Sequence, residues 1–241
     1  SLLIKRIIRF GAPSGAQFFL DVAGFAAFII FVGALGDVPL AASNIAFSIN
    51  TLAFMPMIGI GIAVSIFVGQ NMGGKNISGA KKSVWSGFHI AFTYMCLIAA
   101  AYLFYPHLFL DPFLSGGRYS HTGEIMNVAI VLLRFVAVYT IFDSLNMIFG
   151  SALKGAGDTK FVMLSNIGLT LFVLVIPSFV LIRFAHANIF GAWYVAALYI
   201  VILGLCFLIR FLTGKWTLMR VIEEVQVPVS GRCRPEVPTV E

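Results

Sequence analysis

Long apolar runs separated by short polar segments account for most of the chain. Each run has roughly 20 residues or more, which is enough to cross the hydrocarbon core of a bilayer as a helix. The runs cover residues 10–36, 39–69, 83–106, 123–153, 160–183 and 189–213. They predict an all-α, polytopic membrane protein whose six-helix transmembrane unit occupies residues 10–213.

The polar segments are short, and several carry turn residues. GDVP follows the first run, GQNMGGKNISGAKK the second and LKGAGDTK the fourth, and each is rich in Gly, Asn or Pro. Residues 106–121 are expected to form a longer loop. Residues 1–9 are expected to lead into the first helix from the cytoplasm, and the polar residues 214–241 to form a disordered cytoplasmic tail. Because the chain begins with Ser, we expect it to be a fragment of a longer protein.

Composition supports the membrane assignment and excludes other classes. The chain is 60% hydrophobic and 11% charged, whereas soluble domains carry roughly 25% charged residues. A net charge of +6 is compatible with nucleic-acid binding, but the basic residues lie between the apolar runs, so we expect no nucleic-acid partner. The three cysteines have no metal-binding or disulfide spacing.

The distribution of Lys and Arg predicts the orientation of the helices. If residue 1 is cytoplasmic, the outer segments hold only Arg118 and Arg183, and Arg134 lies within a helix. The inner segments then hold most of the 16 basic residues, namely Lys5, Arg6, Arg9, Lys75, Lys81, Lys82, Lys154, Lys160, Arg210, Lys215, Arg220, Arg232 and Arg234. This bias follows the positive-inside rule and places both termini of the segment in the cytoplasm, with the helices in the inner (plasma) membrane.

Two carboxylates, Asp21 and Asp143, lie inside apolar runs. At a rise of 1.5 Å per residue, they lie about 16 Å and about 15 Å from the inner ends of their helices. They therefore share a level near the middle of the bilayer. An ionised, unpaired carboxylate is costly there, so each residue is expected to bind a cation, take up a proton or face a water-filled cavity.

Other polar side chains fall near these two carboxylates. Tyr139 and Asn146 lie one turn before and after Asp143, on the same helix face. With Asn50 in the second run, they offer additional oxygens to a hard cation such as Na⁺ at Asp21, Asp143 and Tyr139. The alternative is that each Asp only hydrogen-bonds a neighbouring helix and has a structural role.

Several stretches of the sequence resemble the C-terminal half of the multidrug and toxic compound extrusion (MATE) transporters. They are GAPSGAQFFLDVAGF, GALGDVPLAASNIAFSINTLAFMPMIGIGIAVSIFVGQNMGGKN and LLRFVAVYTIFDSLNMIFGSALKGAGDTK. The resemblance covers about residues 10–215 and implies one six-helix lobe of a transporter of the MOP superfamily. In the NorM-type branch, Asp143, Tyr139 and Asp21 match residues that take part in cation coupling, although that branch commonly has Glu at the position of Asp21.

The resemblance implies an antiporter that exports cationic, often aromatic, compounds in exchange for Na⁺ or H⁺. Its partners are then small organic cations, the lipid bilayer and the missing N-terminal lobe. Phe18 and Phe19 are candidates to line an aromatic cavity. We expect no cofactor besides the coupling ion, and no enzyme activity, because no catalytic motif for intramembrane hydrolysis is present. A lipid-linked saccharide flippase of the same superfamily and a non-transporting scaffold remain the alternatives.

Overall fold

The computed structural model describes residues 2–114, 121–184 and 188–218, and within these ranges it is all helical. Six helical segments are long and apolar enough to cross a membrane. Five of them are α1 (Leu2–Gly33), α2 (Asp37–Gly73), α3 (Ile77–Phe104), α5 (Thr122–Gly155) and α8 (Ile189–Leu212). The remaining segment joins α6 (Thr159–Leu169), the π-helix η1 (Thr170–Val175) and α7 (Ile176–Arg183). The predicted fold class is therefore confirmed.

The helix bounds differ from the predicted runs at several ends. Helix α1 begins at Leu2, inside the predicted lead-in 1–9, and α3 begins at Ile77 rather than at residue 83. The stretch expected to be a loop contains a short helix, α4 (Pro106–Leu114). Hydropathy marks the apolar part of a helix, whereas a helix continues until its last turn is capped, so such differences are expected. Arg118 and most of the predicted tail, residues 219–241, lie outside the described residues.

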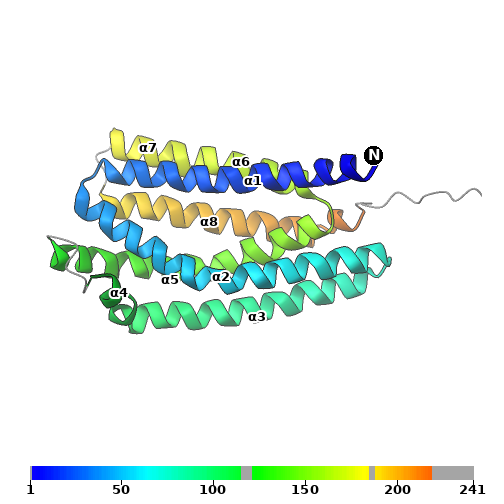
Figure 1. The fold of residues 1–241 in the computed structure, drawn as a ribbon, viewed down its shortest axis with the longest axis horizontal. Helices are drawn as coiled ribbons and strands as arrows, with labels where there is room; N and C mark the ends of the chain where they lie inside the picture. The colour runs from blue at the N-terminus through cyan, green and yellow to red at the C-terminus, as the bar shows by residue number, and fades with distance from the viewer. Residues whose placement is uncertain (1, 115–120, 185–187, 219–241) are drawn as a thin grey trace, which may run out of the picture.

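The helices form a bundle in which α5 and α8 are the most buried spans. In Figure 1, α1 lies beside α6 and α7, α8 lies between this group and α2 with α5, and α3 lies beyond them. We refer to the two ends of the bundle as the Asp37 end, where α2 and α8 begin, and the Asp158 end, where α6 begins. The bundle has a continuous apolar core to which all the long helices contribute.

The turn between α5 and α6 shows how the sequence ends a helix. Gly157 has a φ of +91°, a conformation that glycine adopts without steric strain. The backbone N–H of Gly157 donates to the carbonyl of Lys154, and that of Asp158 donates to the carbonyl of Leu153. These two bonds are the Schellman arrangement, which satisfies the last carbonyls of α5. The LKGAGDTK segment thus reverses the chain and places Asp158 at the start of α6.

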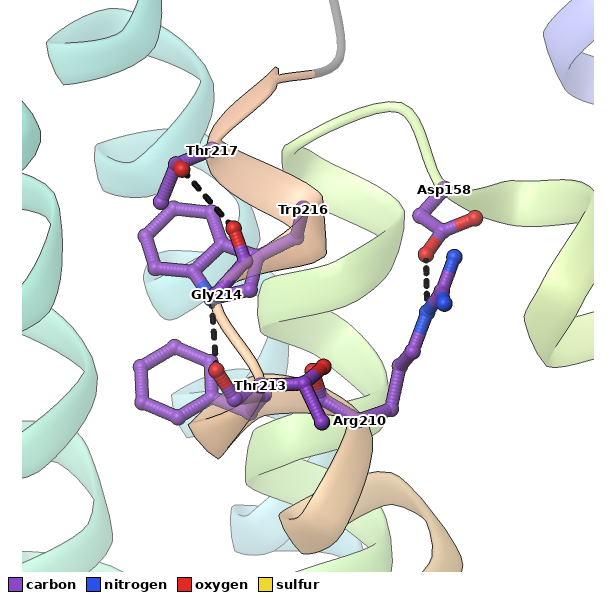
Figure 2. Close-up of polar contacts among 7 residues, drawn as sticks. Asp158, Arg210, Thr213, Gly214, Trp216 and Thr217 are labelled. Atoms are coloured by element: carbon purple, nitrogen blue, oxygen red, sulfur yellow. Dashed lines mark hydrogen bonds and ion pairs between the residues drawn. The ribbon is translucent and has the colours of Figure 1, made fainter.

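A cluster of polar contacts closes the Asp158 end of the bundle (Figure 2). Arg210, near the end of α8, donates from Nε to Asp158 Oδ2 at 2.8 Å, and its guanidinium lies 4.4 Å from the centre of the Phe161 ring. Trp216, in the 3₁₀-helix η2 (Lys215–Leu218), donates to the carbonyl of Phe211 and stacks on its ring. The contacts of Arg210 join the end of α8 to the beginning of α6, and those of Trp216 hold η2 against the end of α8.

Candidate functional site: a buried carboxylate pair

One face of α1 carries Asp21 into the bundle. Gln17, Asp21, Gly24 and Phe28 are spaced three or four residues apart and therefore lie on the same side of the helix. Gln17 and Phe28 are buried, and a Cβ added at Gly24 would lie 2.5 Å from Thr170 Cγ2. The Asp21 face of α1 thus packs against η1, and the Asp21 side chain is partly buried.

Helix α5 supplies the second carboxylate. Asp143 and Tyr139 are both buried, and they lie one turn apart as their spacing predicts. Asn146 donates from Nδ2 to Asp143 Oδ1 at 3.0 Å. The spacing predicts Asn146 as a source of an oxygen ligand, but in the structure its amide nitrogen faces the carboxylate. Helix α8 comes close at this level, because a Cβ on Gly204 would lie 2.8 Å from the Phe142 carbonyl oxygen.

The two carboxylates are close enough to interact electrostatically. Within the described part of the chain, neither lies in an ion pair with a basic side chain. Two like charges without a direct counter-ion repel each other strongly in a medium of low dielectric constant. A cation or a proton would relieve this repulsion, and that is the chemistry expected of a coupling site. The participation of Asp21, Asp143 and Tyr139 in coupling stays a prediction.

A hydrogen-bonded group beside Asp21 was not predicted. It consists of Asn166 on α6, Thr170 at the start of η1 and Tyr199 on α8, all of which are buried. Asn166 Oδ1 accepts from the Thr170 hydroxyl at 3.0 Å and from the Tyr199 hydroxyl at 3.4 Å, and the two hydroxyls lie 3.0 Å apart. The Asn166 and Gln17 side chains both lie next to the Asp21 carboxylate. The signal in the sequence was Asn166 and Thr170, two polar residues one helical turn apart in an apolar run.

Lys154 is nearer to the carboxylates than the sequence analysis placed it. The sequence predicts it in the polar segment after the fourth apolar run, and in the structure it lies in the last turn of α5 and is partly buried. It follows Asp143 by eleven residues, which is about three turns, so both side chains leave α5 on nearly the same face. Lys154 interacts electrostatically with Asp21. The buried pair therefore has a cation in its vicinity, on the side of the Asp158 end.

Aromatic rings fill the bundle on the other side of Asp21, toward the Asp37 end. Phe25 lies one turn beyond Asp21 and packs edge-on against Phe47 and Tyr199. Phe47 stacks on Trp193 with ring centres 4.9 Å apart, and Trp193 donates from Nε1 to Ser43 Oγ at 3.0 Å. This packing joins α1, α2 and α8 and fills the bundle between the carboxylate pair and the Asp37 end.

The remaining predicted site residues lie in two different settings. Asn50 on α2 is partly buried, and its Oδ1 atom is buried without a hydrogen-bond partner among the described residues. Phe18 and Phe19 lie on the surface of the lobe, with 72% and 70% of their area exposed. A carbonyl oxygen without a donor suits a cation ligand, whereas the two phenylalanines are available only to lipid or to another protein surface. Their predicted role as cavity lining stays a prediction.

The residues present fit a hard cation or a proton better than a transition metal. No group of three or more His, Cys, Asp or Glu side chains that could hold a metal ion occurs in residues 2–114, 121–184 and 188–218. Carboxylate, amide and phenol oxygens, by contrast, are the ligands that Na⁺ takes.

Comparison with known families identifies the lobe. The family model MatE matches residues 13–181. The chain belongs to the MATE family. This is a family of transporters rather than enzymes. A curated relative, "Multidrug resistance protein NorM" of Aliivibrio fischeri, is 30% identical over 155 residues, which is 64% of this chain and 32% of that protein. "Probable multidrug resistance protein NorM" of Pseudomonas syringae pv. tomato is 28% identical over 195 residues, 81% of this chain and 42% of that protein.

Solved MATE structures share the fold of this lobe. A structure described as "MATE in the bent conformation" matches with a TM-score of 0.76 at 18% identity, over 92% of this chain and 46% of that one. An outward-facing MATE structure matches with a TM-score of 0.73 at 21% identity, over 87% of this chain and 45% of that one. An inward-facing MATE structure also matches with a TM-score of 0.73 at 18% identity, over 92% of this chain and 48% of that one. The chain therefore spans about half the length of these transporters.

Proposed function

We propose that the chain is one lobe of a secondary active antiporter that exports cationic organic compounds across the cytoplasmic membrane. Influx of Na⁺ or H⁺ drives the export, and Asp21, Asp143 and Tyr139 form the coupling site. The N-terminal half of the same transporter supplies the second lobe, and both ends of this segment face the cytoplasm. Alternating access then rocks the two lobes about a site near the middle of the bilayer.

The observation that carries this proposal is the carboxylate pair itself. Asp21 and Asp143 interact electrostatically inside the bundle, and among the described residues neither has an ion-pair partner. A pair in this state binds a monovalent cation favourably, and the loss of that cation changes the charge balance of the lobe interior. The similar match of the lobe to outward-facing and inward-facing structures supports a lobe that moves largely as a body.

The acidic character of the pair also favours organic cations over lipid-linked saccharides. A flippase for pyrophosphate-linked sugars needs several cationic groups near the middle of the membrane, where Arg and Lys meet phosphate oxygens. At the level of Asp21 and Asp143 this lobe offers two carboxylates, with Lys154 as the neighbouring cation. We therefore do not favour the flippase alternative.

The test is efflux of ethidium from cells that carry the full-length transporter gene. Asp21→Asn and Asp143→Asn are expected to reduce efflux to the level of cells without the transporter, with unchanged amounts of protein in the membrane. Asp37→Asn changes an exposed carboxylate at the start of α2 and serves as the matched control that keeps efflux. Wild-type efflux in both buried variants would instead fit a scaffold.

The wild-type transporter in proteoliposomes identifies the coupling ion. Efflux driven by a Na⁺ gradient at constant pH indicates Na⁺, and efflux driven by a pH gradient without Na⁺ indicates protons. If wild-type protein exports ethidium under neither gradient, the antiport proposal is wrong.

A further inference from the structure

The amide of Asn166 connects three helices at the level of Asp21. Its oxygen accepts both nearby hydroxyls, Thr170 at 3.0 Å and Tyr199 at 3.4 Å. Because the oxygen is used in this way, the NH₂ group is the part that remains to donate toward the Asp21 carboxylate. Asn166 is only 1% exposed, so no solvent competes for these bonds. One side chain thus links α1, α6 with η1, and α8.

Thr170 places this link at a change of helix type. It is the first residue of η1, a six-residue π-helix in the middle of the span, with regular α-helix on both sides. A π-turn inside an α-helix is rare and usually marks a position where the helix bends or serves a function. Pro177 follows two residues after η1 and lacks the backbone N–H needed for a regular helical bond. Residues 170–177 are therefore the part of this span that departs from the regular α-helical hydrogen-bond pattern.

The contact between α1 and η1 at Gly24 leaves no room for a side chain. A Cβ on Gly24 would lie 2.5 Å from Thr170 Cγ2 and 3.8 Å from Leu174 Cδ2. Gly24 lies one turn from Asp21 on the same face of α1. A small rotation of either helix at this level must therefore change the position of the other, because no space separates them.

We propose that Asn166, Thr170 and Tyr199 transmit the occupancy of Asp21 to the π-helical turn η1. The inference rests on the proposed coupling role of Asp21. While Asp21 is unoccupied and charged, the Asn166 amide donates to it and is held by Thr170 and Tyr199. A cation or proton at Asp21 takes over the carboxylate oxygens, so the amide turns away and releases Thr170. The segment from α6 to α7 then bends at η1, and α7 moves relative to α1.

These residues are positioning residues, which act on substrate through the helix they move. The groups that face Asp21 are Asp143 and Lys154 on α5, Tyr199 on α8, Asn166 on α6 and Gln17 on its own helix. Removing the Asn166 link takes a donor from the charged form of Asp21 but leaves the other groups in place. The coupling ion should then bind more tightly, while transport becomes slower because the signal no longer reaches η1.

The experiment uses the full-length transporter in proteoliposomes, with ethidium as substrate and a gradient of the coupling ion. Thr170→Val keeps the shape of the side chain and removes the hydroxyl, and Tyr199→Phe removes only the other hydroxyl. For both we expect the maximal rate to fall about 3- to 10-fold. The ion concentration at half-maximal rate should fall as well, with the ethidium KM unchanged. Thr170→Ser should restore what Thr170→Val loses, because it keeps the hydroxyl.

Ser43→Ala is the matched control. It removes a buried inter-helix hydrogen bond of 3.0 Å, from Trp193 to Ser43, in which neither Asp21 nor the Asn166, Thr170 and Tyr199 group takes part. It should leave the half-maximal ion concentration unchanged. If Thr170→Val and Tyr199→Phe behave like Ser43→Ala, the link has only a packing role and the inference is wrong.

Asp21→Asn in the same assay separates this inference from the proposed function. Wild-type ion dependence in Asp21→Asn would contradict the proposed function. Loss of transport in Asp21→Asn, with wild-type kinetics in both hydroxyl variants, would leave that function intact and overturn the inference alone. Asn166→Leu adds a third variant, and the two hydroxyl variants keep the test decisive if Asn166→Leu does not fold.

Discussion

Asp143 and Asp158 are carboxylates of nearly equal burial, with 7% and 5% of their surface exposed, yet their surroundings differ. Asp158 accepts a hydrogen bond from Arg210 Nε at 2.8 Å, and that guanidinium also lies over the Phe161 ring. Asp143 accepts a hydrogen bond from the neutral amide of Asn146 at 3.0 Å, and it interacts electrostatically with a second carboxylate, that of Asp21. Burial alone therefore does not distinguish a carboxylate that is paired within the chain from one that is open to an external cation. The group that pairs with the carboxylate makes this distinction, because a counter-ion supplied by the chain leaves no place for an external cation.

The largest expected effect on efflux and stability comes from neutralising Asp143 and Asp158 in separate variants. Asp143→Asn should abolish ethidium efflux and leave the melting temperature of the purified transporter close to that of the wild type, because an amide replaces an unpaired charge. Asp158→Asn should do the reverse, with a lower melting temperature and efflux per molecule that is largely kept. Efflux and thermal melting of both variants in one preparation check this. If both variants lose efflux and stability alike, the contrast between the two carboxylates does not hold.

Arg210→Gln removes the counter-ion of Asp158 and leaves the carboxylate in place. It leaves Asp158 buried without a counter-ion, which should cost about 2–3 kcal/mol of stability, less than for a fully buried pair because Arg210 is partly exposed. Thermal melting and the amount of transporter in the membrane measure this cost. The double variant Asp158→Asn with Arg210→Gln should recover most of it, since no unpaired charge remains. A double variant no more stable than Arg210→Gln would show that packing on Phe161, rather than the charge pair, holds this end together.

A smaller effect is expected where α1 meets the π-helix. Gly24→Ala places a methyl group against Thr170, so α1 must shift, at a cost of about 1–3 kcal/mol. Its matched control is Gly59→Ala on α2, where a Cβ meets nothing within 4 Å and the helix gains propensity. We expect Gly24→Ala to lower both melting temperature and efflux, and Gly59→Ala to lower neither. Equal behaviour of the two variants would contradict the close contact.

The fold could be predicted because six apolar runs leave a chain of this composition few alternatives. The carboxylate pair could be predicted in part, since depth in a membrane follows from counting residues along each helix. The partners of that pair could not. Asn166, Tyr199 and Lys154 come to Asp21 from three different helices, and a single sequence does not say which helices are neighbours.

Asp158 is a second residue whose partner could not be predicted from the sequence. The sequence placed it beside a turn, which is correct, but its burial depends on Arg210 at the far end of α8. Likewise, Gly24 looks like any glycine in an apolar run until the position of Thr170 is known. Local sequence patterns therefore predict the helices and the depth of each residue in the membrane. The contacts between helices decide which polar groups lie together.

The position of Lys154 has a consequence for the number of ions moved. Asp21 and Asp143 in their ionised forms, together with Lys154 in its protonated form, sum to a formal charge of −1. Uncompensated charge is costly inside a membrane, which favours a neutral balance. One monovalent cation restores that balance, and a second would overshoot it. If Asp21 and Asp143 form the proposed coupling site, this count predicts one coupling ion per transport cycle through this lobe, with the amine of Lys154 fixing the number.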